Sequence, residues 1–156
     1  MPIFLHSRAR LGILAAVDIA DNQHLGPVRA SVVALRHGLS ARACEPALQA
    51  LTAAGIIKGV RGPSGGYVLA RPASAITLRA LYEAFEVLES LDEAPTVLRD
   101  VVAPRLAEAH GEYLAALAKI TLASLLSPEA GPPLLPGRLH KRAVGASRTI
   151  AETEPG

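Results

Sequence analysis

The residues best suited to act on a partner molecule lie in a glycine-rich stretch at positions 55–71. Its centre places a single arginine, Arg61, between two glycines, and short apolar runs flank the tip at 56–60 and 67–70. Apolar runs bounded by turn residues predict a β-hairpin. Because glycine lacks a side chain and tolerates unusual backbone angles, such a tip can approach a partner closely. A protruding hairpin with one cation at its tip is suited to a negatively charged groove.

The same tip also matches a catalytic pattern, the G-x-S-x-G motif of serine hydrolases, at residues 62–66. That motif needs a strand before it, a helix after it, and Asp and His partners downstream. Here the apolar run at 67–70 continues as a strand, and 156 residues are too few for the hydrolase sheet. A phosphate-binding loop is excluded as well, because no Gly-Lys-Ser/Thr follows. We therefore predict no catalytic residue and no enzyme.

Thiol and imidazole groups give no pattern of a metal or cofactor site. The five histidines are scattered without metal-ligand spacing, so no metal and no cofactor are predicted. The single cysteine, Cys44, excludes an intramolecular disulfide and fits a reducing cytosol. A redox role would disturb binding by its helix, but Cys44 falls on an apolar stripe with Leu48 and Leu51, where a thiol is inert. Without a signal-peptide pattern or a membrane-length apolar run, a cytoplasmic location is expected.

The charges divide the chain into a basic and an acidic part, although the net charge is only +2. Residues 1–71 hold eight Arg/Lys and three acids, whereas residues 72–126 hold four and eight. A basic first half indicates a polyanionic partner. A chance fluctuation in surface charge is the alternative explanation.

Hydrophobic periodicity predicts helices at 3–20, at about 28–37 and at 41–54. Gly38 can end the second helix in the left-handed conformation, and Ser40 can cap the third. Pro46 lacks an N–H, so we expect a slight kink or a late start of the third helix. Two helices joined by a short turn and followed by a hairpin predict a winged helix-turn-helix, in a mainly α fold with a small β-hairpin wing. The open side of the third helix would present Arg42, Glu45, Gln49 and Thr52.

The chain after the hairpin predicts a means of pairing two copies. Thr77 can cap a fourth helix, and a long helix is expected from about 96 to 126, bent or broken at Pro104. Its apolar band is wider than one small domain can cover, which indicates a partner surface. We expect a DNA-binding domain at 1–75, linker and dimerisation helices at 76–126, and a flexible Pro/Gly-rich tail at 127–156. One face of the long helix carries Leu106, Ala109, Tyr113, Leu117 and Ile120.

Residues 60–71, with the sequence VRGPSGGYVLAR, resemble the wing of the Rrf2 family of bacterial transcriptional regulators. The resemblance extends to Gly38-Leu39-Ser40, to Ser7-Arg8 with Asp18, and to the segment 76–78, and it covers about residues 1–126. It implies a homodimeric, sequence-specific regulator, expected to be a repressor, on a pseudo-palindromic operator in double-stranded DNA. The long C-terminal helix would cross to the partner copy through Leu106, Tyr113, Leu117 and Ile120.

The resemblance also implies roles for single residues. The third helix would lie in the major groove, with Ser40, Arg42, Glu45 and Gln49 facing bases or phosphates. This agrees with the preference of arginine for guanine edges and of glutamate for cytosine. Arg61, with Gly62 and Ser64, would enter the minor groove, whose negative potential favours arginine. Ser7 and Arg8 would lie near phosphates.

The sequence departs from the iron–sulfur members of the family in one segment. Those members carry three cysteines between the fourth helix and the dimerisation helix, whereas residues 90–103 contain none. Because a cluster needs several thiolates, we expect no cluster sensing. A small-molecule effector and a repressor governed by its own abundance both remain open. The alternative functions are a winged-helix protein-interaction module and an effector-binding regulator with weak DNA binding.

Overall fold

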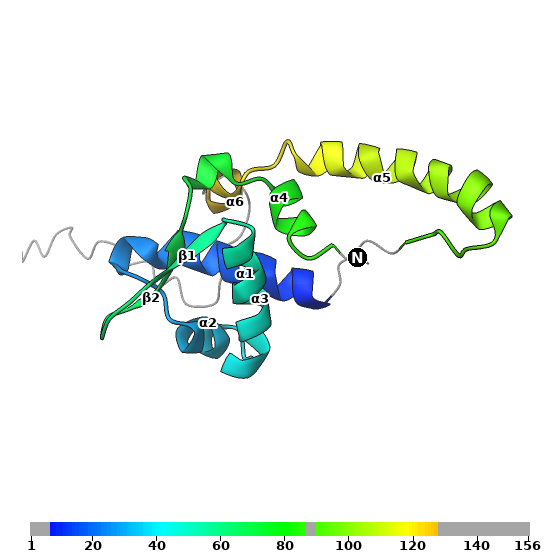
Figure 1. Ribbon diagram of the computed structural model, residues 1–156. Coiled ribbons are helices and arrows are strands. Elements are labelled where there is room, and N and C mark those ends of the chain that lie inside the picture. The colour runs from blue at the N-terminus through cyan, green and yellow to red at the C-terminus, as the bar shows by residue number, and fades with distance from the viewer. Residues whose placement is uncertain (1–6, 87–89, 128–156) are drawn as a thin grey trace, which may run out of the picture.

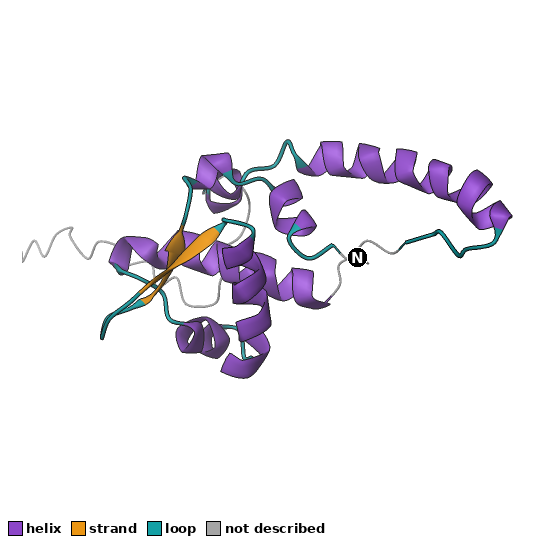
Figure 2. Cartoon of the chain, in the orientation of Figure 1, coloured by secondary structure: helices purple, strands orange, loops and turns teal. Residues whose placement is uncertain are grey.

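A computed structural model describes residues 7–86 and 90–127. Within them, helices and one two-stranded antiparallel sheet follow one another along the chain (Figures 1 and 2). This confirms the predicted mainly α fold with a small hairpin. The elements are α1 (Ser7–Asn22), η1 (Gln23–Leu25), α2 (Ala30–Arg36), α3 (Ala41–Ala53), β1 (Ile57–Val60), β2 (Gly66–Leu69), η2 (Ala73–Ala75), α4 (Leu78–Glu83), η3 (Val97–Val102), α5 (Ala103–Leu117) and α6 (Leu122–Leu126).

The helix-turn-helix unit consists of α2, a short turn and α3, packed on α1 (Figure 1). The chain turns at Gly38, whose φ of 64° lies in the left-handed region, as predicted. Ser40 then caps α3, because its side chain accepts a hydrogen bond from the Ala43 N–H at 3.2 Å. The helix begins at Ala41 and runs through Pro46, so the late start considered for it is not observed. Both Pro46 and Arg42 are exposed, so water can replace the missing hydrogen bond.

An aliphatic core joins α1, α3, the hairpin and the last helices. It contains no tryptophan, and its largest fully buried side chains are leucine and isoleucine, as expected from the composition. Leu122 of α6 is completely buried in it, although it lies far along the sequence from the helix-turn-helix unit. The core therefore ties the end of the described chain to its beginning. Its fully buried large members are Ile19, Leu48, Leu51, Ile56, Ile57, Ile76, Leu81 and Leu122.

The prediction of one long helix over 96–126 is wrong. The chain is helical without interruption from Thr96 to Leu117, with a π-helical segment, η3, before Pro104 in the first turn of α5, so the break considered at this proline is not observed. The helix ends at Leu117, and Thr121 beyond it pairs with Thr77 in an isolated antiparallel bridge. The bridge requires extended backbone, and it lets Leu122 reach the core at the start of α6. Burial of this leucine outweighs the helical periodicity of the segment.

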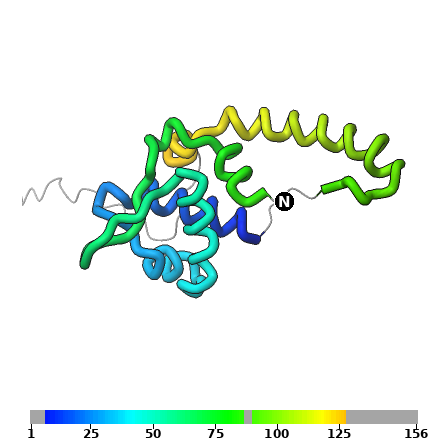
Figure 3. Tube along the Cα trace, viewed as in Figure 1, coloured from blue at the N-terminus to red at the C-terminus, as the bar shows by residue number. Residues whose placement is uncertain are grey.

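The helix α5 projects away from the rest of the molecule (Figures 1 and 3), and none of its residues is buried. It contacts α4 through a small aromatic cluster, in which the Tyr82 and Tyr113 rings meet edge-to-face at 5.5 Å. His110 Nε2 lies 3.0 Å from Glu86 Oε1 beside these rings. The rest of the α5 surface carries large apolar side chains that no other described part of this chain covers. Residues 128–156 of the tail predicted at 127–156, and residues 3–6 of the first predicted helix, lie outside the described residues.

Candidate nucleic-acid interface

The open side of α3 is the one that the sequence predicted. Ser40, Arg42, Glu45 and Gln49 are all exposed along it. The opposite side of the helix is closed, with Cys44, Leu48 and Leu51 buried in the core. The helical period that separates the two sides therefore leaves the polar side chains free to meet a partner. Their roles on DNA stay predictions.

The wing is a short antiparallel hairpin that extends beyond the body of the molecule (Figure 1). Its strands pair from Ile57 opposite Leu69 to Val60 opposite Gly66, close to the extent predicted. In the tip, the Gly65 N–H donates to the Gly62 carbonyl at 2.9 Å and closes the turn. The predicted tip residues Arg61, Gly62 and Ser64 are all exposed.

The tip-side half of β2 is attached to the segment before α2. Val28 and Tyr67 exchange two backbone hydrogen bonds of 2.9 and 2.8 Å, so this loop acts as a short third strand. The second predicted helix, expected from about Val28, therefore begins two residues later, at Ala30. Only glycine fits at position 66, because a Cβ there would lie 2.7 Å from the Val28 backbone. Sequence periodicity assigned Val28 to the helix because its apolar side chain matches the pattern of Val32 and Leu35.

Two side chains that the sequence analysis missed also hold the wing. Arg29 Nη2 donates to the Pro63 carbonyl oxygen at 2.5 Å, and Gln23 Oε1 accepts from the Leu69 N–H at 2.9 Å. The first contact holds the tip and the second holds the base. Gln23 lies in η1 and Arg29 is the N-cap residue of α2, and neither belongs to a recognisable motif, so no signal in a single sequence points to their contacts with the wing.

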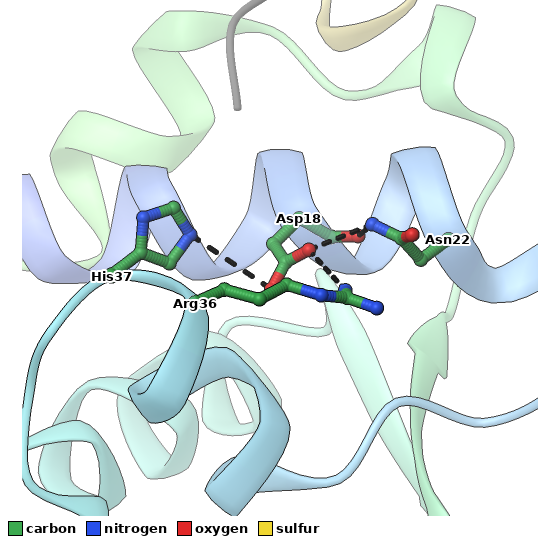
Figure 4. A network of polar contacts seen from close by, with 4 residues as sticks. All are labelled: Asp18, Asn22, Arg36 and His37. Carbon is green, nitrogen blue, oxygen red and sulfur yellow. Dashed lines mark hydrogen bonds and ion pairs between the residues drawn. The ribbon is translucent and has the colours of Figure 1, made fainter. Parts of the chain in front are cut away.

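A buried carboxylate fixes the helix-turn-helix unit against α1 (Figure 4). Asp18 of α1 is completely buried, and its Oδ1 accepts from Arg36 Nη1 at 2.6 Å and from Asn22 Nδ2 at 2.7 Å. His37 Nε2 lies 3.8 Å from the other carboxylate oxygen. Arg36 and His37 end α2 and begin the turn into α3. The network therefore sets the direction in which the recognition helix leaves the body.

The remaining predicted DNA-binding residues are at the start of α1. Ser7 and Arg8 are exposed there. In the view of Figure 1, α3 lies between the wing and this end of α1. The predicted site residues thus come from three parts of the fold: the start of α1, α3 with its cap, and the wing.

The exposed charges around this site are almost all positive. Within residues 7–71, Glu45 is the only exposed acidic side chain, because Asp18 is buried and Asp21 is half-buried. Such an excess of exposed cations attracts a polyanion and accelerates its encounter with the protein. The exposed cations of this part of the chain are Arg8, Arg10, Arg29, Arg42, Lys58, Arg61 and Arg71.

Comparison with known proteins agrees with this arrangement. The sequence profile of the Rrf2 family, described as iron-dependent transcriptional regulators, matches residues 5–128. The chain belongs to the Rrf2 family. That family is described by transcriptional regulation and not by an enzymatic activity, which agrees with the prediction made from the sequence. The resemblance seen in the wing is therefore confirmed over most of the chain.

Individual relatives within the Rrf2 family are also similar to this chain. The HTH-type transcriptional regulator IscR of Escherichia coli is 34% identical over 95 residues, which cover 61% of this chain and 55% of that protein. The chain thus spans about half the length of the curated relatives it matches. Among solved structures, IscR of T. potens has a TM-score of 0.65 at 29% identity, covering 81% of this chain and 88% of the other. CymR, the global cysteine regulator of B. subtilis, has a TM-score of 0.60 at 26% identity, with 80% and 96% covered.

The iron in the description of the Rrf2 family can be tested against the donor groups of this chain. Iron–sulfur clusters are held by several cysteine thiolates, and this sequence has one cysteine. Cys44 is buried in α3, and burial raises the pKa of its thiol, so it stays protonated at neutral pH. No group of three or more His, Cys, Asp or Glu side chains in residues 7–86 and 90–127 could hold a metal ion. These residues do not fit an iron–sulfur centre.

The helices of this Rrf2 member are also short or polar by the standard of membrane proteins. In the parts of the chain that the structure describes, none combines the length and the hydrophobicity that a membrane span requires.

Proposed function

We propose that this chain is a sequence-specific DNA-binding regulator that acts in the cytoplasm as a homodimer and represses transcription from a pseudo-palindromic operator. One observation carries the proposal: the exposed side of α3 and the wing tip belong to residues 7–71, whose exposed charges, Glu45 excepted, are positive. A helix with a free polar side fits the major groove of B-DNA. A thin hairpin with an arginine at its tip fits the adjacent minor groove.

In this proposal the two contacts have different roles. The start of α3 reads base edges, with Arg42 directed to guanine and Glu45 to cytosine, while Ser40 and Gln49 bind phosphates or bases. Arg61 enters the minor groove, and Gly62 and Ser64 keep the tip thin enough to follow it. Ser7 and Arg8 bind phosphates beyond the recognition helix. Residues 1–75 would form the DNA-binding domain.

The homodimer rests on the uncovered apolar side of α5. On α5, Leu106 is 62% exposed and Tyr113 42%, while Leu117 is half-buried; Ile120, just beyond the end of the helix, is 37% exposed. Monomeric proteins rarely leave such a series of apolar side chains in water. Pairing with α5 of a second copy would cover them and would place two wings on one DNA duplex. The segment 76–126 would then serve dimerisation.

The DNA-binding proposal is tested by the salt dependence of binding to a duplex selected by the protein from a random-sequence library. For Arg61→Ala we expect weaker binding and a plot of log K against log salt whose slope is smaller by about 1, since one phosphate-region cation is lost. Arg79→Ala is the matched control, because Arg79 is exposed on α4 and pairs with Glu83 outside this surface. The measurement is fluorescence anisotropy from low to high salt.

A wild-type protein that selects no sequence, or binds without a steep salt dependence, would contradict the proposal. That result would favour a winged-helix module that binds proteins instead. Equal slopes for wild type and Arg61→Ala would show that Arg61 at the wing tip does not contact DNA.

A further inference from the structure

The wing tip is held by a side chain from a distant part of the sequence. Arg29 immediately precedes α2, in extended backbone with φ −77° and ψ 145°. From there its guanidinium reaches the carbonyl oxygen of Pro63, 34 residues further along the chain. Pro63 lies between the two predicted contact residues Gly62 and Ser64, two positions after Arg61.

We propose that Arg29 is a positioning residue that fixes the direction of the wing tip, so that Arg61 and α3 contact DNA as one rigid unit. This inference rests on the proposed DNA-binding function and adds a residue to it. Arg29 acts through Arg61 and not by its own contact with DNA.

The hairpin needs such a contact because it has little support of its own. A two-stranded hairpin is marginally stable in water unless it packs on something else. The bridge between Val28 and Tyr67 attaches β2 near its tip end, but among the described backbone hydrogen bonds none from another element reaches the tip at 61–65, which keeps its freedom to move about that attachment. A second contact at Pro63 removes this freedom. An arginine donor suits it, because hydrogen bonds from a charged group are stronger than those between neutral groups.

The contact also connects the tip to the recognition helix. Arg29 precedes the first turn of α2, and the far end of α2 is fixed by the ion pair between Arg36 and Asp18. The turn at Gly38 then leads directly to the cap of α3 at Ser40. A short series of rigid elements therefore runs from the wing tip to the residues that would read the major groove.

The first test uses the free protein and needs no DNA. Exchange of the Gly65 amide, which closes the tip turn, is compared by NMR in wild type, Arg29→Ala, Arg29→Lys and the control Arg79→Ala. We expect about tenfold faster exchange in Arg29→Ala, the size of one lost charge-assisted hydrogen bond. Arg29→Lys should recover part of the protection, because lysine can still donate to the Pro63 carbonyl. Equal exchange in Arg29→Ala and wild type would overturn the inference.

The second test is a double-mutant cycle on DNA affinity at one salt concentration. Arg29→Ala should weaken binding by about tenfold when Arg61 is present and by less than about threefold in the Arg61→Ala background, since both changes act on one contact. The urea midpoint of Arg29→Ala should match that of wild type, because Arg29 is exposed. Equal losses in the two backgrounds would mean that Arg29 meets DNA directly, and the positioning role would be wrong. A wild type that binds no DNA would refute the proposed function, while the exchange experiment would still decide the role of Arg29.

Discussion

Among single residues, Asp18 has the environment with the strongest consequence for stability. Its carboxylate is completely buried and depends on Arg36 and Asn22 for partners. Arg36 is only partly exposed and ends the helix that precedes the recognition helix. The pair therefore supports the proposed DNA-binding surface, although neither residue lies on its predicted reading side.

We predict that Arg36→Ala lowers the free energy of unfolding by about 3 kcal/mol, because it leaves a buried carboxylate without its cation. Adding Asp18→Asn to Arg36→Ala should recover part of this loss, since the second change removes the unpaired charge. Urea unfolding of the two single variants and the double variant measures the coupling. Arg79→Ala, which breaks an exposed pair, should cost no more than about 1 kcal/mol. Strictly additive losses at positions 18 and 36 would show that the two side chains do not depend on each other.

Among single residues, the sequence predicted the exposed side chains of α3 and missed the side chains that hold the wing in place. The helical period of 41–54 is enough to separate Arg42, Glu45 and Gln49 from the buried side, because one local repeat determines both sides. Arg29 and Gln23 bond to residues 34 and 46 positions away. Contacts over such distances leave no trace in local periodicity, so a single sequence cannot reveal them.

Among the elements, the wing depends most on one close backbone contact. Gly66 lies where β2 meets the loop before α2, and any side chain there would meet the Val28 backbone at 2.7 Å. Gly59 lies in the paired strand and would accept a Cβ with nothing within 4 Å. The two glycines of one hairpin therefore form a matched pair for substitution.

We predict that Gly66→Ala lowers the free energy of unfolding by about 1–3 kcal/mol, the usual effect of forcing extra volume into a packed site. Gly59→Ala should stay within about 0.5 kcal/mol of wild type. Urea unfolding gives both values, and amide exchange at Tyr67, whose N–H bonds to Val28, reports the bridge itself. The attachment of the wing to the loop would be disproved if Gly66→Ala kept the wild-type exchange rate at Tyr67.

Element boundaries were predictable where local signals set them and not where tertiary contacts did. The caps at Ser40 and Thr77 lie where the sequence placed them, because a capping hydroxyl acts within a few residues. The helix expected over 96–126 ends at Leu117 because Thr121 pairs with Thr77, a partner 44 positions earlier in the sequence. Helical periodicity continues through this break, and so it could not show where the chain leaves the helix.

For the whole molecule, α5 determines how two copies would meet. We predict that Leu106→Glu shifts the protein from dimer to monomer, because a carboxylate at this position would be buried without a partner. Leu106 is 62% exposed in the single chain, so the change should leave the fold intact. Ala115→Glu, at an exposed position nearer the end of the same helix, adds the same charge and is the control. Light scattering after size-exclusion chromatography measures the mass, and an unchanged dimer in Leu106→Glu would place the interface elsewhere.

The division of the chain into a basic and an acidic part is also a property of the whole molecule. The basic first part contains α3 and the wing, and the acidic second part contains α4 and α5. Like charges on α5 and DNA repel each other, which favours approach through the basic part of the chain. The distribution was readable from the sequence, but which of the cations are exposed required the fold.

Hydroxyl-radical footprinting of the full chain on a duplex selected from a random-sequence library tests the central claim most directly. The account predicts two sets of protected positions related by a dyad, with the half-sites about one helical turn or a multiple of it apart. Arg61→Ala should lose protection at one minor-groove position in each half and keep the rest, while Arg79→Ala should match wild type. A footprint without dyad symmetry, or one that Arg61→Ala leaves unchanged, would contradict a dimeric regulator that reads DNA with its wings.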